Sequence, residues 1–183
     1  TIRISTRGSI TNLPGFHEGR WWVQDVAARL TAGLAGEFSG KTVLDLCAAP
    51  GGKTAYFAAG GGTITAVDRS SPRLLRLNEN MIRLGLKVKI INADILNWQP
   101  DTPAQIVMLD APCTATGTAR RHPDVLWVKS SKDLTRLVST QRKMLRAAAK
   151  MVAPGGLMIF ATCSLQPEEG VRHIRSFLED HRD

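Results

Sequence analysis

The sequence predicts an α/β fold with a doubly wound, mainly parallel sheet, and three observations favour this class. Short apolar runs of strand length alternate along the chain with longer segments of helical periodicity. Turns rich in glycine and proline separate the two kinds of segment. Polar or small residues follow several apolar runs directly, as expected where the carboxyl ends of parallel strands line a ligand crevice. The 183 residues, 43% of them hydrophobic, suffice for one domain with its own core.

Residues 1–36 are expected to form an N-terminal loop and helix that pack on a core of residues 37–183. The first 20 residues contain a turn at Leu13-Pro-Gly-Phe16, and residues 21–36 place apolar side chains at the period of a helix. The first predicted strand, 43–47, is a buried one. Small residues after it lead into a short helix over 53–59.

The rest of the chain repeats this alternation of strands and helices. A second strand over 63–68 leads to a helix that Pro72 begins in its first turn and Gly85 ends. The other predicted elements are strands over 87–92, 105–110 and 156–163, a long helix over 132–152, and a last helix opened by Pro167. Alternating strands and helices predict parallel pairing with crossover helices.

Composition limits the compartment and the partners. The net charge of +8 favours a polyanionic partner, with nucleic acid ahead of an anionic membrane surface. No apolar run approaches the roughly 18–20 residues of a membrane span, and no signal-peptide pattern opens the chain. Three cysteines are an odd number, which favours a reduced, cytoplasmic compartment. The histidines lack metal-ligand spacing, so no metal is expected.

Two cysteines stand where an apolar strand gives way to a loop. Cys113 lies in Asp110-Ala-Pro-Cys, where Pro112 stiffens the chain and makes Asp110 and Cys113 close neighbours. Cys163 lies in Thr162-Cys-Ser after the fifth predicted strand. A lone cysteine is usually a small core residue, which is how we interpret the side chain of Cys47. Two thiols at separate strand exits instead predict nucleophilic chemistry in the crevice.

A third strand exit, residues 47–54, supplies a candidate cofactor cradle. Its small side chains allow a ligand to approach the backbone, and the free amides at a helix start suit a carboxylate or phosphate. Gly52-Lys53-Thr54 matches the end of a phosphate-binding loop, but Cys47 stands where that motif needs glycine. A P-loop-like nucleotide hydrolase is therefore a weaker alternative.

Two acidic residues follow the next strands. Asp68 ends the second strand, where an acid commonly binds a ribose hydroxyl, although it can also cap the following helix. Asp94 follows the third strand, where either an adenine contact or a turn aspartate is expected.

These motifs together resemble the Sun/Fmu/RsmB family of S-adenosylmethionine-dependent RNA cytosine-C5 methyltransferases. Residues 47–53, Asp110-Ala-Pro-Cys113 and Thr162-Cys-Ser164 carry the resemblance, which extends from Leu13 to Glu169. The block 115–124 is most similar to family members that act on bacterial 16S ribosomal RNA. The resemblance implies a Rossmann-like methyltransferase core over 37–183, S-adenosylmethionine as cofactor and ribosomal RNA as partner.

The resemblance also implies a role for individual residues. Asp68 would bind the ribose, Asp94 the adenine end, and Asp110 would sit between cofactor and base. Cys163 would be the nucleophile and Cys113 would assist product release, although DNA cytosine methyltransferases attack with the cysteine that corresponds to Cys113. The methionine and ribose side of the cofactor would be lined by Cys47, Ala48, Ala49, Pro50, Gly51, Gly52 and Lys53.

The loop after Cys113 is the candidate RNA contact. Arg120 and Arg121 would grip phosphates near a base that has left its stack, and the alternative is a solvated basic loop. A non-catalytic RNA-binding scaffold of the same fold remains a further alternative. Family members carry seven strands and only five can be recognised here, so we expect a truncated chain or a covered edge at the fifth strand.

Overall fold

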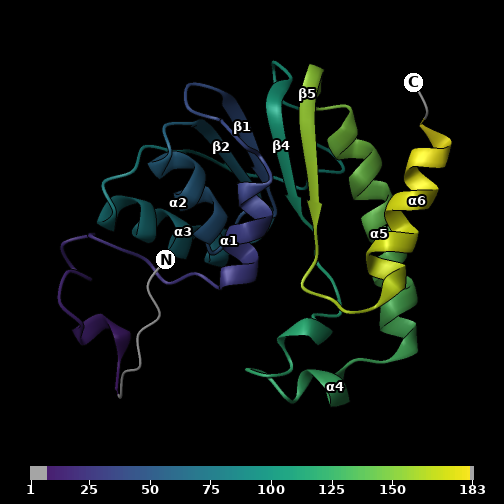
Figure 1. The fold of residues 1–183 in the computed structure, drawn as a ribbon, viewed down its shortest axis with the longest axis horizontal. Coiled ribbons are helices and arrows are strands. Elements are labelled where there is room, and N and C mark those ends of the chain that lie inside the picture. The colour runs from purple at the N-terminus through teal and green to yellow at the C-terminus, as the bar shows by residue number, and fades with distance from the viewer. Residues whose placement is uncertain (1–7, 182–183) are drawn as a thin grey trace.

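The computed structural model describes residues 8–181 and contains a five-stranded sheet in the order β3-β2-β1-β4-β5 (Figure 1). All four strand pairings are parallel. The strands are β1 (Thr42–Leu46), β2 (Thr63–Asp68), β3 (Lys89–Asn92), β4 (Ala104–Asp110) and β5 (Val152–Ala161). The chain order reverses between β1 and β4, and such a switch point is where open parallel sheets bind ligands. The predicted doubly wound fold is confirmed.

Helices cover both faces of the sheet (Figure 1). The helices are α1 (Val26–Gly33), α2 (Gly52–Ala59), α3 (Ser71–Arg83), α4 (Val125–Val128), α5 (Ser131–Ala149) and α6 (Val171–Asp180). Short 3-10 turns occur at Ile10–Asn12, Thr116–Thr118 and Pro167–Glu169. The first three α-helices pack on one face, and α5 and α6 pack on the other.

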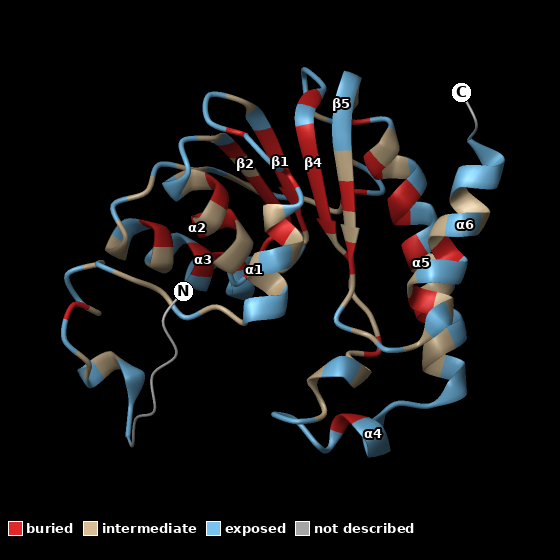
Figure 2. Cartoon of the chain, in the orientation of Figure 1, coloured by how far each residue is buried: buried red, intermediate tan, exposed pale blue. Residues whose placement is uncertain are grey.

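Successive side chains of the central strands point to opposite faces of the sheet, so each strand contributes to a core on both faces. In β4, Ile106 and Met108 join the cluster that contains Phe57 of α2, whereas Val107 and Leu109 join the cluster with Leu145 of α5. Both sets are buried, and Figure 2 shows that the central strands are buried along most of their length. This packing fixes the carboxyl ends of β1 and β4 side by side.

The N-terminal segment is tied to α3. The Arg83 guanidinium donates hydrogen bonds to the main-chain oxygens of Phe16 (2.7 Å) and Trp21 (3.1 Å) and lies over the Phe16 ring. This close approach requires glycine at position 19, because a Cβ there would stand 1.9 Å from the Arg83 main-chain oxygen. The turn at 13–16 is therefore a docked part of the structure.

Several predicted boundaries are wrong. The first helix begins at Val26 and not at residue 21, because the Asp25 side chain caps it by accepting from the Ala27 amide at 2.8 Å. The fifth strand begins at Val152, four residues earlier than expected. A register shift between β4 and β5 lets the strand pass through Pro154 and Gly155.

The edge of the sheet and the helix lengths bear on two further expectations. Among residues 8–181, β5 pairs with β4 alone, so its other edge has no strand partner. No helix in the same range is both long and apolar enough to cross a lipid bilayer.

Candidate active site

A cavity opens at the carboxyl edge of the sheet and collects residues from the exits of all five strands. It is lined by six of the predicted site residues, namely Cys47, Asp68, Asp94, Asp110, Cys113 and Cys163. Residues 48–53 do not line this cavity; residues 48–51 form the turn into α2 beside it, and Gly52 and Lys53 begin that helix. The predicted cofactor and catalytic groups therefore share one crevice at the switch point of the sheet.

The two thiols are the centre of this site. Cys113 Sγ and Cys163 Sγ lie 3.4 Å apart, within hydrogen-bond distance for sulfur. The register of β4 with β5 brings them together, because Asp110 pairs with Ala161 and each cysteine follows a few residues later. Cys163 is exposed to the cavity and Cys113 is half-buried.

The sulfur–sulfur contact shifts the pKa values of the two thiols in opposite directions. The hydrogen bond from the Cys113 thiol lowers the pKa of Cys163 from 9.0 to about 7, and the nearby Lys53 ammonium acts in the same direction. The same hydrogen bond and burial raise the pKa of Cys113. With these pKa directions, Cys163 is the more easily deprotonated of the two thiols and Cys113 is the hydrogen-bond donor to its thiolate, which is the reactive form of a cysteine.

We expect the alkylation rate of Cys163 by iodoacetamide to rise with pH around a midpoint of about 7. The pKa is lowered, so the thiolate accumulates above this midpoint and is lost below it. An ordinary thiol would show its midpoint near 8.5. Peptide mapping by mass spectrometry follows each cysteine separately. A midpoint of 8.5 or higher at Cys163 would contradict the assigned thiol pair.

Lys53 and Asp110 form an ion pair at the same edge. Lys53 Nζ donates to Asp110 Oδ2 at 2.7 Å, and the Lys53 side chain is largely buried. The pair connects the first turn of α2 to the end of β4, so the cradle and the Cys113 loop are fixed relative to each other. Lys53 is therefore one step removed from the cavity, and Asp110 is the group that faces it.

The turn from β1 into α2 has the tight backbone that its small residues predict. Cys47 has a φ of 61° and Gly51 a φ of 101°, both in the left-handed region. A Cβ on Gly51 would also stand 2.9 Å from Cγ of Leu77 in α3. Burial raises the pKa of the Cys47 thiol to about 12, so Cys47 contributes shape and not nucleophilicity.

The sequence analysis missed Asp45, a fully buried carboxyl group in β1. Thr54 Oγ1 donates to its Oδ2 at 2.6 Å, whereas its Oδ1 has no hydrogen-bond partner among residues 8–181. Burial raises the pKa of Asp45 to about 7. The signal was present, since an aspartate inside a strand that is otherwise apolar is rarely buried without a reason.

The two predicted cofactor acids both line the cavity and both make local contacts. Asp68 Oδ2 accepts from the Ala49 amide at 3.2 Å and pairs with Arg73 at 3.3 Å, while its Oδ1 accepts from the Ser70 amide at 2.9 Å. Asp94 Oδ1 accepts from the Leu96 amide at 3.0 Å, which is the geometry of a turn aspartate. Both aspartates therefore make the local contacts expected of a capping or turn residue, and both also line the cavity.

The basic loop differs between its two arginines. Arg121 is ion-paired with Asp25, the residue that caps α1. Arg120 makes no ion pair among residues 8–181 and is exposed. The same segment contains Trp127, which is 89% exposed. Neither arginine lines the cavity.

Comparison with known proteins gives a consistent result. The family model described as 16S rRNA methyltransferase RsmB/F matches residues 36–183. "Ribosomal RNA small subunit methyltransferase B" of Erwinia tasmaniensis is 40% identical over all of this chain and 44% of its own length. The protein of the same name from Vibrio vulnificus is 38% identical over 97% of this chain and 43% of its own length.

Solved structures agree with these relatives. NSun6 from Pyrococcus horikoshii, solved with the S-adenosylmethionine analogue SFG, superposes with a TM-score of 0.86 and 32% identity. That match covers 95% of this chain and 46% of the other. A methyltransferase homologue from the same organism gives a TM-score of 0.80 at 30% identity, covering 96% of this chain and 56% of the other.

The extent of the matches is as informative as their identity. The chain spans a little under half the length of the curated relatives that it matches. The family-model match includes all five strands and both cysteine loops. On the family match, the relatives and the shared fold, the chain belongs to the RsmB/F family of 16S rRNA methyltransferases.

Proposed function

We propose that this chain is the catalytic part of an enzyme that methylates C5 of a cytosine in 16S ribosomal RNA through a covalent cysteine adduct. One observation carries the proposal: Cys163, with a lowered pKa, is exposed in the cavity that Asp68 and Cys47 also line. A ribosomal RNA substrate would place the reaction in the cytoplasm, as the sequence predicts.

The cofactor is S-adenosylmethionine, and the residues present fit it. Asp68 offers carboxylate oxygens to ribose hydroxyls, and Asp94 lies farther along the same cavity for the adenine end. Gly51 keeps the backbone of the turn compact, so a ligand can approach it. When bound, the cofactor supplies an electrophilic methyl group on a sulfonium.

Cys163 is the group that activates the cytosine ring for methylation. C5 of the ring is a poor nucleophile until a thiolate adds to C6, which breaks the C5–C6 double bond and pushes its electrons toward C5, N3 and O2. Asp110 lines the cavity as a carboxylate paired with Lys53 Nζ at 2.7 Å, so this ion pair is placed to meet that charge, with the Lys53 ammonium as its proton-carrying member. After methyl transfer, a water molecule acting as base takes the C5 proton, the C5–C6 double bond re-forms, and the Cys163 thiolate leaves.

Cys113 acts in the release step, when the Cys163 thiolate leaves C6 of the methylated ring. Its sulfur lies 3.4 Å from Cys163 Sγ and retains its proton in the resting site. It can return that hydrogen bond to the departing thiolate, which stabilises the leaving group. Covalent catalysis needs both a good nucleophile and a good leaving group, and the pair supplies both with the same contact.

Arg120 is expected to contact an RNA phosphate. In Arg120→Ala, the slope of log affinity against log salt concentration should flatten by about 0.7–0.9, the loss of one phosphate contact. Lys150→Ala is the matched control, because Lys150 is exposed and follows α5 at the amino edge of the sheet, away from the cavity. RNA-binding titrations at several salt concentrations measure both. Equal slopes in both variants and the parent protein would refute this contact.

The proposal is tested by incubating the protein with labelled S-adenosylmethionine and 16S ribosomal RNA and identifying the labelled nucleoside. We expect 5-methylcytidine. Binding of cofactor and RNA without methyl transfer would support the scaffold alternative. Calorimetry that detects ATP binding but no S-adenosylmethionine binding would support a nucleotide hydrolase instead. A label on another nucleoside or ring position would overturn the proposed chemistry.

A further inference from the structure

Glu169 is a fully buried carboxyl group that the proposed chemistry does not use. It ends the 3-10 turn Pro167–Glu169, between β5 and α6, and its exposed fraction is 0%. Burying a carboxyl group costs solvation energy unless donors surround it. The contacts of Glu169 therefore indicate what that burial achieves.

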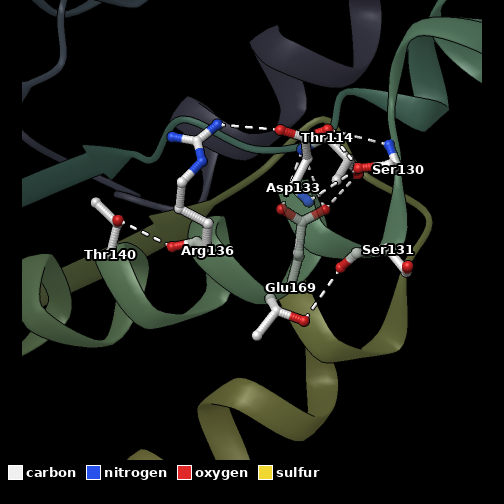
Figure 3. A network of polar contacts seen from close by, with 8 residues as sticks. Thr114, Ser130, Ser131, Asp133, Arg136, Thr140 and Glu169 are labelled. Carbon is white, nitrogen blue, oxygen red and sulfur yellow. Dashed lines mark hydrogen bonds and ion pairs between the residues drawn. The ribbon is translucent and has the colours of Figure 1, made fainter.

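The Glu169 carboxyl group holds the residue that follows Cys113 (Figure 3). Its Oε1 accepts from the Thr114 amide at 3.0 Å, and Oε2 accepts from the same amide at 3.2 Å. The Thr114 hydroxyl donates to Oε2 as well. Thr114 is itself 2% exposed. These bonds fix the backbone on the carboxyl side of Cys113.

Gln141 of α5 fixes the other side of the same cysteine. Its Nε2 donates to Glu169 Oε1 at 2.9 Å and to the main-chain oxygen of Pro112 at 2.9 Å. Gln141 is also fully buried. Cys113 thus lies between two residues, Pro112 and Thr114, that both connect to one buried pair of side chains.

The loop that carries Cys163 is attached to the same residue through its main chain. Thr162 Oγ1 donates to the main-chain oxygen of Glu169 at 3.3 Å. Ser164 Oγ lies 3.0 Å from Thr114 Oγ1, so the residue after Cys163 contacts the residue after Cys113. The neighbours of both cysteines therefore converge on Glu169.

We propose that Glu169 is a positioning residue that sets the 3.4 Å contact between the Cys113 and Cys163 thiols. It touches neither sulfur and acts through Thr114, Gln141 and Thr162. The inference rests on the proposed role of the thiol pair, but its test reads the thiols directly and uses neither RNA nor cofactor. A failure of methyl transfer in the parent protein would leave the result of this test intact.

The test variant is Glu169→Gln, which keeps the volume but replaces one acceptor oxygen with an NH2 group facing the donors of Thr114. Two readouts report the thiol contact: the pH midpoint of Cys163 alkylation, and the rate at which phenylarsine oxide bridges Cys113 and Cys163. We expect the midpoint to move from about 7 toward 8.5. The bridging rate should fall at least about tenfold, as small misplacements of reacting groups have large kinetic effects.

His173→Leu is the matched control. His173 is buried in the same layer, stacks on Phe160 and lies near Gln141 and Glu169, but it makes no hydrogen bond to the Glu169 carboxyl group. It reports what a packing change in this layer does to the thiols without breaking the Glu169 bonds. We expect its midpoint and bridging rate to match those of the parent protein.

The proposal fails if folded Glu169→Gln retains the parent midpoint and bridging rate, or if His173→Leu shifts both to the same extent. If Glu169→Gln does not fold, Thr114→Val provides the second test. This change removes the hydroxyl bond to Oε2 and leaves the amide bonds, so the midpoint and the rate should move in the same direction by less. Parent values in folded Thr114→Val would then overturn the proposal.

Discussion

Cys163→Ala should lower the rate of RNA methylation by roughly a thousandfold or more, because removing a covalent nucleophile removes the whole adduct pathway. The sulfur of Cys163 is exposed in the cavity and has the lowered pKa of the pair. Single-turnover transfer of labelled methyl groups to 16S ribosomal RNA measures the effect. The loss should appear in the rate constant at saturating RNA, because the thiol is not among the groups proposed to bind RNA or cofactor.

Cofactor binding is the control for this variant. Calorimetry should give the same affinity for S-adenosylmethionine in Cys163→Ala and in the parent protein, since Asp68 and the Cys47 turn are unchanged. Normal methyl transfer by Cys163→Ala would overturn the assignment. A matching loss in Cys113→Ala, with no adduct formed, would move the nucleophile to Cys113.

Cys113→Ala should accumulate a covalent complex between the protein and RNA. The variant leaves Cys163 able to add to C6 but removes the thiol that stabilises its departure, 3.4 Å away. Denaturing gel electrophoresis with labelled RNA detects the complex, and the multiple-turnover rate should fall in parallel. The alkylation midpoint of Cys163 should also rise from about 7, since the hydrogen bond from Cys113 is the largest cause that lowers its pKa.

The double variant Cys113→Ala/Cys163→Ala is the control for the trapped complex. It should give no covalent RNA, because no thiol remains in the cavity apart from the inert Cys47. A complex that persists in the double variant would show that another residue bonds to RNA. Absence of any complex in Cys113→Ala, at a normal turnover rate, would remove Cys113 from the release step.

Local patterns were sufficient for the strands and most helices, because the sheet depends on short apolar runs and on turns of glycine and proline. They failed where a non-local contact decides the outcome. Strand β5 extends back through Pro154 and Gly155 only because the shifted register with β4 accommodates them. Helix α4 was missed, since four residues around an exposed Trp127 have no detectable period.

The candidate site, too, was only partly predictable from local patterns. Sequence motifs identified Asp110, Cys113 and Cys163. The 3.4 Å contact between the two cysteine sulfurs, however, follows from the pairing of Asp110 with Ala161 across β4 and β5. The ion pair of Arg121 with Asp25 joins residues 96 positions apart, which no local pattern predicts. Cofactor and family were predicted correctly through the resemblance, and the residue roles stay predictions.

The central claim is that the sulfur at position 163 bonds to C6 of the target cytosine. The most direct test uses 16S ribosomal RNA that contains 5-fluorocytosine, whose C5 fluorine cannot leave as a proton does, so the methylated adduct persists. After digestion, mass spectrometry locates the modified peptide. The account predicts one adduct, on Cys163, that requires S-adenosylmethionine to carry a methyl group. An adduct on Cys113, or methylated RNA with no adduct on either cysteine, would contradict it.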